Sequence, residues 1–428
     1  MSNSLLIKQA SILGDKPVDI LIVDGVITEI AESISAPSDQ VFDGTGLVAM
    51  PGFVDLHTHL REPGRENSET IATGSLAAAR GGYTAVSAMA NTLPVADTAA
   101  IVEQVAAIGK SVGLVDVFPI GAVTKGLEGH ELADLGSMAQ SKAQVRIFSD
   151  DGNCVSDPLL MRRALEYVKQ FDGVIAQHAQ DPRLTEGSQM NEGVVASTLG
   201  LKGWPAVAEE SIIARDILLA NMVGARLHIC HVTTAGGVEI IRWAKAQGMK
   251  VTAEVTPHHL LLTDELATSY DPIYKVNPPL RTISDVEALR AGLADGTIDI
   301  IGTDHAPHPV ESKECEWQNA AFGMVGLETA FPILYTTLIS TGVISWQRAA
   351  AVMSTAPAEI GGYRSHGQPL AVGAPAQIAL VDPKGVMVVD RAKLASKSKN
   401  TPFHGMEFQG TVAATVFNGH LTHKVGNK

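Results

Sequence analysis

Two histidines separated by one residue, His57 and His59, follow an apolar run in the segment GFVDLHTHLREPG, where Asp55 belongs to the same alternation. Alternate residues of a β-strand lie on one face, so the two imidazoles would point the same way. Two imidazole nitrogens on one face can chelate a zinc-like cation at about 2.0–2.1 Å. The alternative is a pair of exposed loop histidines, and the buried strand that precedes the pair favours the metal site.

Other polar residues end other apolar runs and could complete such a site. His178 ends GVIAQHA, His231 ends ARLHICH and Asp304 ends IDIIGTD. A solitary histidine there is usually a hydrogen-bonded core residue, but several at equivalent strand ends favour a divalent metal, zinc first. The pair Asp150-Asp151 in FSDDG adds a carboxylate that could bridge two ions. Neighbouring strand residues face opposite ways, so only one of the two can point inward, and the pattern leaves open which.

The elements that must position these residues alternate along residues 51–366. Helix-like segments separate eight apolar strand candidates, GFVDLHTHL, YTAVSAMAN, LVDVFPIGAV, QVRIFSDDG, GVIAQHA, ARLHICHVT, KVTAEVTPHHL and IDIIGTDHAPH. Strands alternating with helices predict an α/β fold, here a (β/α)8 TIM-like barrel. Barrel active sites lie at the C-terminal ends of the strands, which is where the polar residues occur.

Both ends of the chain have a different pattern. Residues 1–50 and 367–428 contain short β-branched runs broken by Gly, Asp and Pro, which indicates strands. Neither segment alone would bury much of a core. We therefore expect them to pair into one small composite β-sandwich domain beside a metal-dependent hydrolase barrel over residues 51–366.

The composition is that of a folded, acidic protein. The 428 residues are 45% hydrophobic, and 32 Lys and Arg against 46 Asp and Glu give a net charge of −14. A disordered chain is excluded, and an acidic balance without a basic block argues against a nucleic-acid partner. No apolar run reaches the ~18–20 residues that span a bilayer, and no signal peptide is evident. Three cysteines cannot form a disulfide framework, so we expect a cytoplasmic protein without a membrane partner.

Two motifs carry a resemblance to a known family: DLHTHLREPG at residues 55–64 and GTDHAPHPVESK at residues 302–313. NPPLR at residues 277–281 and NTPF.G at residues 400–405 support them. With these motifs the chain resembles the amidohydrolase superfamily and, within it, the bacterial class I dihydroorotases. The resemblance extends over the barrel and both terminal segments.

The resemblance implies one or two zinc ions and a role for each matching residue. His57 and His59 would bind one zinc, His178 and His231 the second, and Asp151 would bridge them. Asp304 would bind the first zinc and act in catalysis. Arg61, Asn91 and His308 match positions that hold a substrate carboxylate, and Asn277 with the backbone of Phe322 and Gly323 matches those that read a pyrimidine ring. The substrate-binding set so implied is His59, Arg61, Asn91, Asn277, His308, Phe322 and Gly323.

The reaction implied is the reversible interconversion of L-dihydroorotate and N-carbamoyl-L-aspartate in de novo pyrimidine (UMP) biosynthesis. Metal-bound hydroxide would attack the ring amide, and Asp304 would act as general base and then general acid. Arg61 could clamp the substrate carboxylate bidentately; the alternative is a surface arginine paired with Glu62 or Glu66. The resemblance also implies a homodimer and a possible association with aspartate transcarbamoylase.

Two other functions compete with this interpretation. An allantoinase or hydantoinase would be expected to carry a carboxylated lysine near the end of the fourth strand, but the segment VRIFSDDGN has none, and Lys142 precedes the strand. A non-catalytic dihydroorotase-like scaffold would be expected to have lost metal ligands, which this chain keeps.

Other segments and residues near the predicted site are expected to have roles other than metal binding. The polar stretch 309–323 after the eighth strand is long enough to form a lid over the substrate. His258 and His259 are expected to form structural hydrogen bonds, and His305 to point away from Asp304. His228 and Cys230 are out of phase with His231, so we expect them to face the helices.

Overall fold

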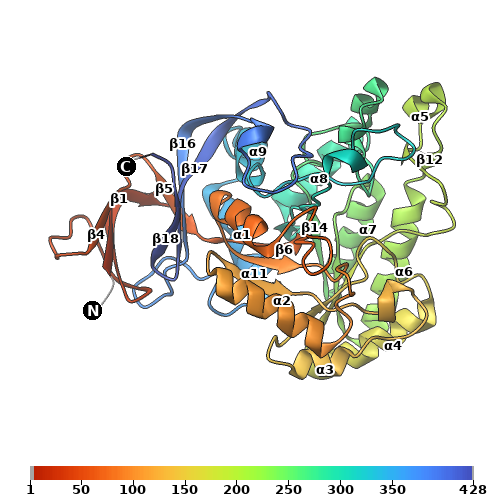
Figure 1. Cartoon of the computed structure of the whole chain (residues 1–428), viewed down its shortest axis with the longest axis horizontal. Helices are drawn as coiled ribbons and strands as arrows, with labels where there is room; N and C mark the ends of the chain where they lie inside the picture. The colour runs from red at the N-terminus through yellow and green to blue at the C-terminus, as the bar shows by residue number, and fades with distance from the viewer. Residues whose placement is uncertain (1–3, 427–428) are drawn as a thin grey trace.

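Eight short parallel strands form the central part of the computed structural model, which describes residues 4–426 (Figure 1). In chain order they are β6 (Phe53–Thr58), β7 (Tyr83–Ala88), β8 (Asp116–Pro119), β9 (Ile147–Phe148), β10 (Val174–Gln177), β13 (Arg226–Ile229), β14 (Val251–Val255) and β15 (Ile300–Ile301). One sheet contains β6, β7 and β8, and a second sheet contains β9, β10, β13, β14 and β15 in that order. Parallel bridges Gly121–Phe148 and Thr58–His305 link the two sheets at both edges and close the ring. The predicted (β/α)8 barrel is confirmed.

Helices follow the barrel strands and cover their outer faces (Figure 1). They are α1 (Ile71–Arg80), α2 (Ala99–Val112), α3 (Leu135–Gln140), α4 (Pro158–Val168), α6 (Val207–Val223), α7 (Ala235–Ala246), α8 (Ile283–Asp295), α9 (Ala330–Leu334), α10 (Trp346–Ala350) and α11 (Ala356–Gly361). The short helix α5 (Val194–Leu199) packs instead in a separate cluster with Met190, Ala267 and Trp317. A short two-stranded pair, β11 (Met190–Asn191) and β12 (Gly203–Trp204), lies between β10 and α6. Among residues 4–426, no helix combines the length and apolar character needed to cross a bilayer.

Local sequence explains where these helices begin and which face they bury, as α4 illustrates. The Asp157 side chain accepts the Leu160 backbone N–H at 2.7 Å and caps the first turn. Pro158 occupies the first helical position, where its missing N–H costs no hydrogen bond. The buried residues recur at a spacing of three and four, which places one apolar stripe against the barrel: Met161, Ala164, Leu165 and Val168.

The two chain ends meet in one eight-stranded sheet beside the barrel, on the left in Figure 1. It consists of β1 (Ser4–Ile12), β2 (Pro17–Val23), β3 (Val26–Ala31), β4 (Gln40–Asp43), β5 (Val48–Pro51), β16 (Ile378–Val388), β17 (Glu407–Phe417) and β18 (His420–Lys424). The N- and C-terminal strands join where β5 pairs antiparallel with β16. Apolar side chains from both chain ends pack into one shared core. The residue limits predicted for the two domains remain our proposal.

The barrel strands are shorter than the apolar runs that predicted them. β9 and β15 each have two residues, and the polar residues expected at their ends lie beyond the last ladder pair. At β6 the register with β7 shifts between Asp55 and Thr58, which marks an irregularity next to His57. Left-handed or bulged backbone at strand ends re-aims side chains, so the polar residues can turn towards the barrel axis.

Phe53 provides a test of the packing that starts the barrel. Its buried ring stacks on Phe331 with centroids 5.6 Å apart and meets Tyr83 edge-on at 5.7 Å. We expect Phe53→Ala to lower the free energy of unfolding by about 3–5 kcal/mol, because it leaves a cavity in a fully buried aromatic cluster. Urea unfolding followed by circular dichroism measures the change. The control Leu159→Ala, at a side chain that is 59% exposed, should change it by less than about 0.5 kcal/mol. Equal effects of the two substitutions would contradict this packing.

Candidate active site

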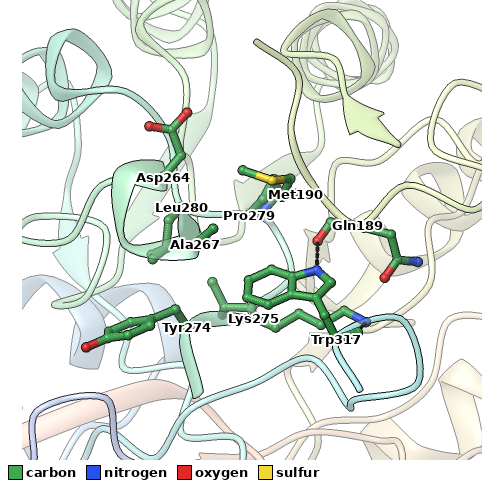
Figure 2. A pocket seen from close by; sticks show the side chains of 10 residues that line it. Gln189, Met190, Asp264, Ala267, Tyr274, Lys275, Pro279, Leu280 and Trp317 are labelled. Atoms are coloured by element: carbon green, nitrogen blue, oxygen red, sulfur yellow. Dashed lines mark hydrogen bonds between the residues drawn. The ribbon is translucent and has the colours of Figure 1, made fainter. Parts of the chain in front are cut away.

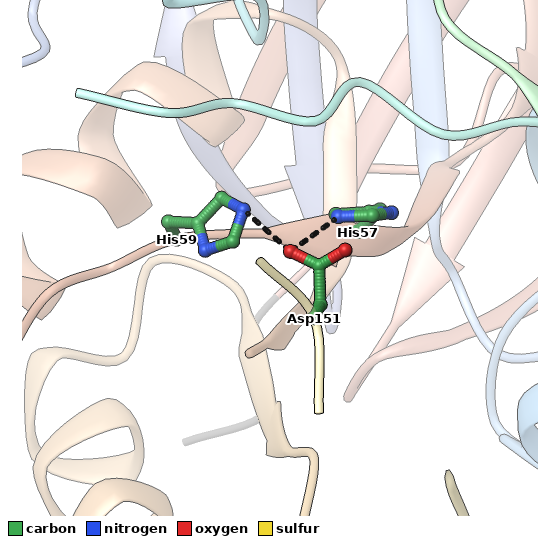
Figure 3. Close-up of side chains that lie close together, drawn as sticks. All are labelled: His57, His59 and Asp151. Carbon is green, nitrogen blue, oxygen red and sulfur yellow. Dashed lines mark ion pairs between the residues drawn. The ribbon is translucent and has the colours of Figure 1, made fainter. Parts of the chain in front are cut away.

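The carboxylate of Asp151 lies between two pairs of histidines at the C-terminal mouth of the barrel. One oxygen, Oδ2, is 3.4 Å from His57 Nε2 and 3.3 Å from His59 Nε2 (Figure 3). The other oxygen, Oδ1, is 3.3 Å from His178 Nδ1 and 3.2 Å from His231 Nε2. All five side chains are buried. Asp151 therefore faces both pairs, one with each oxygen.

Three of these histidines have a hydrogen-bond acceptor behind the ring, on the side away from Asp151. An acceptor at one ring nitrogen fixes the proton there and leaves the other nitrogen with a free lone pair. The pairs are His57 Nδ1 with Glu254, His59 Nδ1 with Asn91 Oδ1 at 3.0 Å, and His178 Nε2 with Gln180 Oε1 at 2.7 Å. When these three rings are neutral, the nitrogens that face Asp151 are therefore the unprotonated ones.

This arrangement fits a divalent metal ion. Lone pairs that point at a carboxylate repel it unless a proton or a metal cation lies between them. His57 Nε2 is buried and has no hydrogen-bond partner among residues 4–426. Burial alone would raise the pKa of Asp151, but the charges and hydrogen bonds of the surrounding histidines hold it well below its ordinary value. Imidazole nitrogens and an ionised carboxylate are ligands typical of such a site, so the two groups that share Asp151 form a candidate metal centre.

Asp304 joins the first pair of histidines from the end of β15. Its Oδ1 lies 3.0 Å from His59 Nε2 and 3.6 Å from His57 Nε2. Burial raises the pKa of Asp304, and the hydrogen bond and charges of these histidines outweigh burial and lower it. The backbone at Asp304 is left-handed, with φ 45°, as it is at His231 (31°) and Arg61 (63°). Residues other than glycine rarely adopt this conformation, and its concentration at one site is typical of functional residues.

The neighbouring carboxylate, Asp150, points away from the histidines. Its Oδ1 accepts the backbone N–H groups of Val123 at 2.8 Å and Thr124 at 3.0 Å, and Oδ2 accepts the Thr124 hydroxyl. The sequence pattern left the choice between Asp150 and Asp151 open. The structure turns the Asp151 carboxylate towards the candidate metal centre and the Asp150 carboxylate towards the loop that follows β8.

Arg61 lies buried next to the first pair of histidines. Its Nε donates to Pro307 O at 3.2 Å, and a terminal nitrogen is 3.5 Å from His308 Nε2. Burial lowers the pKa of Arg61 to about 10, which still leaves the guanidinium charged at neutral pH. Glu62 and Glu66 instead accept the backbone N–H groups of Ile71 and Gly64. The structure thus shows a buried cation at the site rather than a surface ion pair.

The remaining residues that we expect to contact the substrate lie in the same region. They differ in whether their hydrogen-bonding groups already have partners. The amide nitrogen of Asn277 donates to Gln180 at 3.3 Å, whereas its buried Oδ1 has no partner within the described chain. His308 Nε2 donates to Phe322 O at 2.7 Å. The Gly323 N–H donates to Lys275 O at 3.0 Å, so its backbone is already hydrogen-bonded. Asn277 therefore offers a free acceptor, while Phe322 and Gly323 would have to exchange an existing bond.

Two lysines anchor the stretch 309–323, which we expected to be a lid. Lys313 Nζ donates to Lys275 O at 3.0 Å and Ala321 O at 2.9 Å, and Lys275 Nζ donates to Trp317 O at 2.6 Å. The Trp317 indole is buried and donates to Gln189 O at 3.4 Å, above the Lys275 chain (Figure 2). The segment thus folds over the loops that follow β10 and β14, and its role as a lid stays a prediction.

Sequence reasoning missed Glu254 and Gln180, which contact histidines from behind. The signal for Glu254 was a charged residue inside the apolar strand VTAEV. Burial raises the pKa of Glu254, but His57 and His228 outweigh burial and keep it well below its ordinary value, so the side chain is ionised. The expectation that His228 and Cys230 face the helices is wrong: His228 contacts Glu254, and Cys230 lies with His57 and Glu254. The left-handed backbone at His231 breaks the alternation that the expectation assumed.

The structure shows the surroundings of three further histidines that we did not expect to bind metal. His305 points away from Asp304 towards Glu69, at 3.3 Å. His259 hydrogen-bonds to Thr256 Oγ1 at 2.7 Å and to Pro278 O at 3.1 Å, as expected. His258 Nε2 is buried without a hydrogen-bond partner within residues 4–426, so the expectation of a hydrogen bond is wrong at that atom.

Comparisons with known proteins identify the family. A family profile described as Dihydro-orotase-like matches residues 46–236. A dihydroorotase of Streptomyces coelicolor is 61% identical over 97% of this chain and 97% of its own length. A dihydroorotase of Leifsonia xyli is 60% identical over 99% and 97%, and one of Mycobacterium tuberculosis is 54% identical over 99% of both chains. The chain belongs to the dihydroorotase family.

Solved structures agree with the fold. The L-hydantoinase (dihydropyrimidinase) of Arthrobacter aurescens superposes with a TM-score of 0.86, at 26% identity, over 100% of this chain and 97% of that one. The dihydropyrimidinase of Brevibacillus agri reaches 0.82 at 23% identity over 99% and 95%. These neighbours have the same architecture at much lower identity than the dihydroorotases. Family membership makes the chain an enzyme that hydrolyses a cyclic amide, and it does not favour the hydantoinase or scaffold alternatives.

The adjacent carboxylates Asp150 and Asp151 can be told apart by substitution. We expect Asp151→Asn to lose metal, because the neutral amide cannot hold a cation between the histidine pairs. Asp150→Asn should keep its metal and lose about 1–3 kcal/mol of stability, because it disturbs a buried carboxylate that accepts two backbone N–H groups. Elemental analysis of the purified variants and thermal unfolding measure the two effects. Metal loss in Asp150→Asn with retention in Asp151→Asn would contradict the assignment.

Proposed function

We propose that the chain is a zinc-dependent dihydroorotase that reversibly interconverts L-dihydroorotate and N-carbamoyl-L-aspartate. The observation that carries the proposal is the arrangement of four histidines around Asp151, with Asp304 and the buried cation Arg61 beside them. Full-length identity of 54–61% to dihydroorotases supports the choice of substrate. The six proposed metal ligands are His57, His59, Asp151, His178, His231 and Asp304.

Zinc is the metal we assign, because the ligand set is rich in imidazole and completed by carboxylates. When bound, it would supply Lewis acidity, which lowers the pKa of water and polarises a carbonyl oxygen. The chain itself supplies the orientation of the ligands. The acceptors behind His57, His59 and His178 fix which nitrogen of each ring faces the centre.

Asp304 is the residue that we propose for proton transfer, first as general base and then as general acid. Its low pKa keeps the carboxylate ionised at neutral pH, so it can accept a proton from the attacking water. The same carboxyl group can then donate that proton to the ring nitrogen that leaves. Its Oδ1 lies 3.0 Å from His59 Nε2, which places the carboxylate beside the proposed metal ligands.

Arg61 is placed to bind the substrate carboxylate. Dihydroorotate and carbamoyl aspartate are both anions, and the chain has a net charge of −14, so attraction must come from local cations. A buried guanidinium can bind a carboxylate bidentately. The free Oδ1 of Asn277 offers an acceptor for a ring N–H. The homodimer and the association with aspartate transcarbamoylase are further proposals that rest on the family resemblance.

A direct assay separates the candidate activities. The purified protein is tested for ring opening of dihydroorotate, allantoin and hydantoin, with its metal content measured in parallel. We expect turnover of dihydroorotate, none comparable of the other two, and zinc in the protein. Preferred turnover of hydantoin would support the alternative hydrolase, and a protein without metal or activity would support the scaffold.

Asp304→Asn tests the proton-transfer role. The amide keeps the shape of the side chain but cannot accept a proton, so we expect kcat to fall by about 10²–10⁴-fold. Circular dichroism should show an unchanged fold. Steady-state kinetics measures the loss, and a kcat near that of the unsubstituted enzyme would rule out Asp304 as the general base.

Arg61→Ala tests the carboxylate clamp. Removing a buried charge-assisted bond of about 1.5–3 kcal/mol should raise KM for dihydroorotate by about 10–100-fold. Arg61→Lys keeps the charge but not the bidentate geometry, so its KM should lie between that of the unsubstituted enzyme and that of Arg61→Ala. An unchanged KM in Arg61→Ala would show that the substrate carboxylate binds elsewhere.

A further inference from the structure

We propose that Glu254 is a positioning residue that organises both halves of the metal centre at once. The inference rests on the proposed function, because it concerns the ligands of that centre. Glu254 lies in β14 and is buried at 1% exposure. It belongs to neither of the two ligand groups that share Asp151, and it reaches one ligand of each half from behind.

A single oxygen of Glu254 makes both contacts. Oε1 hydrogen-bonds to Nδ1 of His57, which belongs to the half that Asp151 Oδ2 faces. The same Oε1 accepts the backbone N–H of His231 at 3.1 Å, and His231 belongs to the other half. The second oxygen, Oε2, accepts from His228 Nε2 at 3.2 Å. The carboxylate is thus shared between the two halves.

The contact with His57 determines which nitrogen can bind metal. A carboxylate at Nδ1 keeps the proton there, so Nε2 presents its lone pair to the centre. Its negative charge also makes the imidazole a stronger donor to a cation. Without this acceptor, the proton could occupy Nε2, and the ring would donate to Asp151 instead of binding metal.

The contact with His231 acts on the backbone rather than the ring. His231 has a left-handed φ of 31°, a conformation that is strained for a residue other than glycine. The Glu254 carboxylate holds the N–H of this residue and so stabilises the turn that aims its imidazole at Asp151. Loss of the carboxylate would relax the turn and move the second half of the centre.

Glycine at position 302 leaves room for the Glu254 carboxylate. A Cβ built there would overlap Oε2, so a larger residue would have to displace the carboxylate. His228 is itself held by Thr252 Oγ1 at 2.9 Å. Two other residues that hydrogen-bond to the proposed ligands each contact only one half of the metal centre. Asn91 contacts only His59 of the first half, and Gln180 contacts only His178 of the second.

Because Glu254 contacts both halves of the centre whereas Asn91 and Gln180 contact one half each, zinc titrations of variants can test the inference. The metal is removed from the full-length protein with a chelator, and Zn²⁺ is added back against a chromophoric competitor that resolves two stepwise dissociation constants. We expect Glu254→Gln to weaken both steps by about 10–100-fold, because the neutral amide removes the charge behind His57 and is a weaker acceptor for the His231 N–H. Asn91→Ala and Gln180→Ala should each weaken one step, and a different one. Co²⁺ absorption spectra of the same variants should show altered ligand fields in both halves only for Glu254→Gln.

Two further variants guard against a merely structural effect. Asp19→Asn removes the charge of a carboxylate buried in the terminal sheet, which accepts the backbone N–H of Ile34, and should leave both steps unchanged. Gly302→Ala should displace the Glu254 carboxylate and weaken both steps even if Glu254→Gln does not fold. Wild-type constants for both steps in Glu254→Gln, or weakening of one step only, would overturn the inference. Failure of the unsubstituted protein to bind Zn²⁺ would instead overturn the proposed function.

Discussion

The structure depends on a buried carboxylate, Asp151, that faces ring nitrogens of histidines on both of its sides. For neutral rings such an arrangement is electrostatically unfavourable unless a proton or a metal cation lies between the groups, because neither lone pair nor carboxylate can donate a proton. The barrel brings these groups together from β6, β9, β10 and β13, and the acceptors behind the rings prevent them from turning to relieve the repulsion. The folded chain therefore holds a candidate metal centre at the mouth of the barrel.

The same centre explains where the backbone departs from regular geometry. Arg61, His231 and Asp304 have left-handed backbone conformations just beyond barrel strands, where regular extended structure would aim them elsewhere. Their cost is offset by contacts with residues distant in sequence, such as Glu254 with the His231 N–H. The outer helices pack on the barrel strands in a large buried core, which holds the strands that carry these residues. Local strain and global packing thus act together at the barrel mouth.

Sequence periodicity predicted much of this arrangement. His57 and His59 share a face because strand side chains alternate, and His178, His231 and Asp304 could be placed because barrel sites lie at strand ends. The pattern could not distinguish Asp150 from Asp151, since the deciding N–H groups of Val123 and Thr124 lie in another loop. Glu254 was missed because its partner His57 is 197 residues away. Contacts of that kind depend on the tertiary fold and leave no local signature.

The most direct test is to collect anomalous diffraction at the zinc absorption edge from crystals of the protein grown with Zn²⁺. The account predicts two anomalous peaks on opposite sides of the Asp151 carboxylate. One would lie within bonding distance of His57 and His59, at about 2.0–2.1 Å from their nitrogens, and the other equally close to His178 and His231. Crystals without a peak beside Asp151, or with metal only at surface residues, would contradict it.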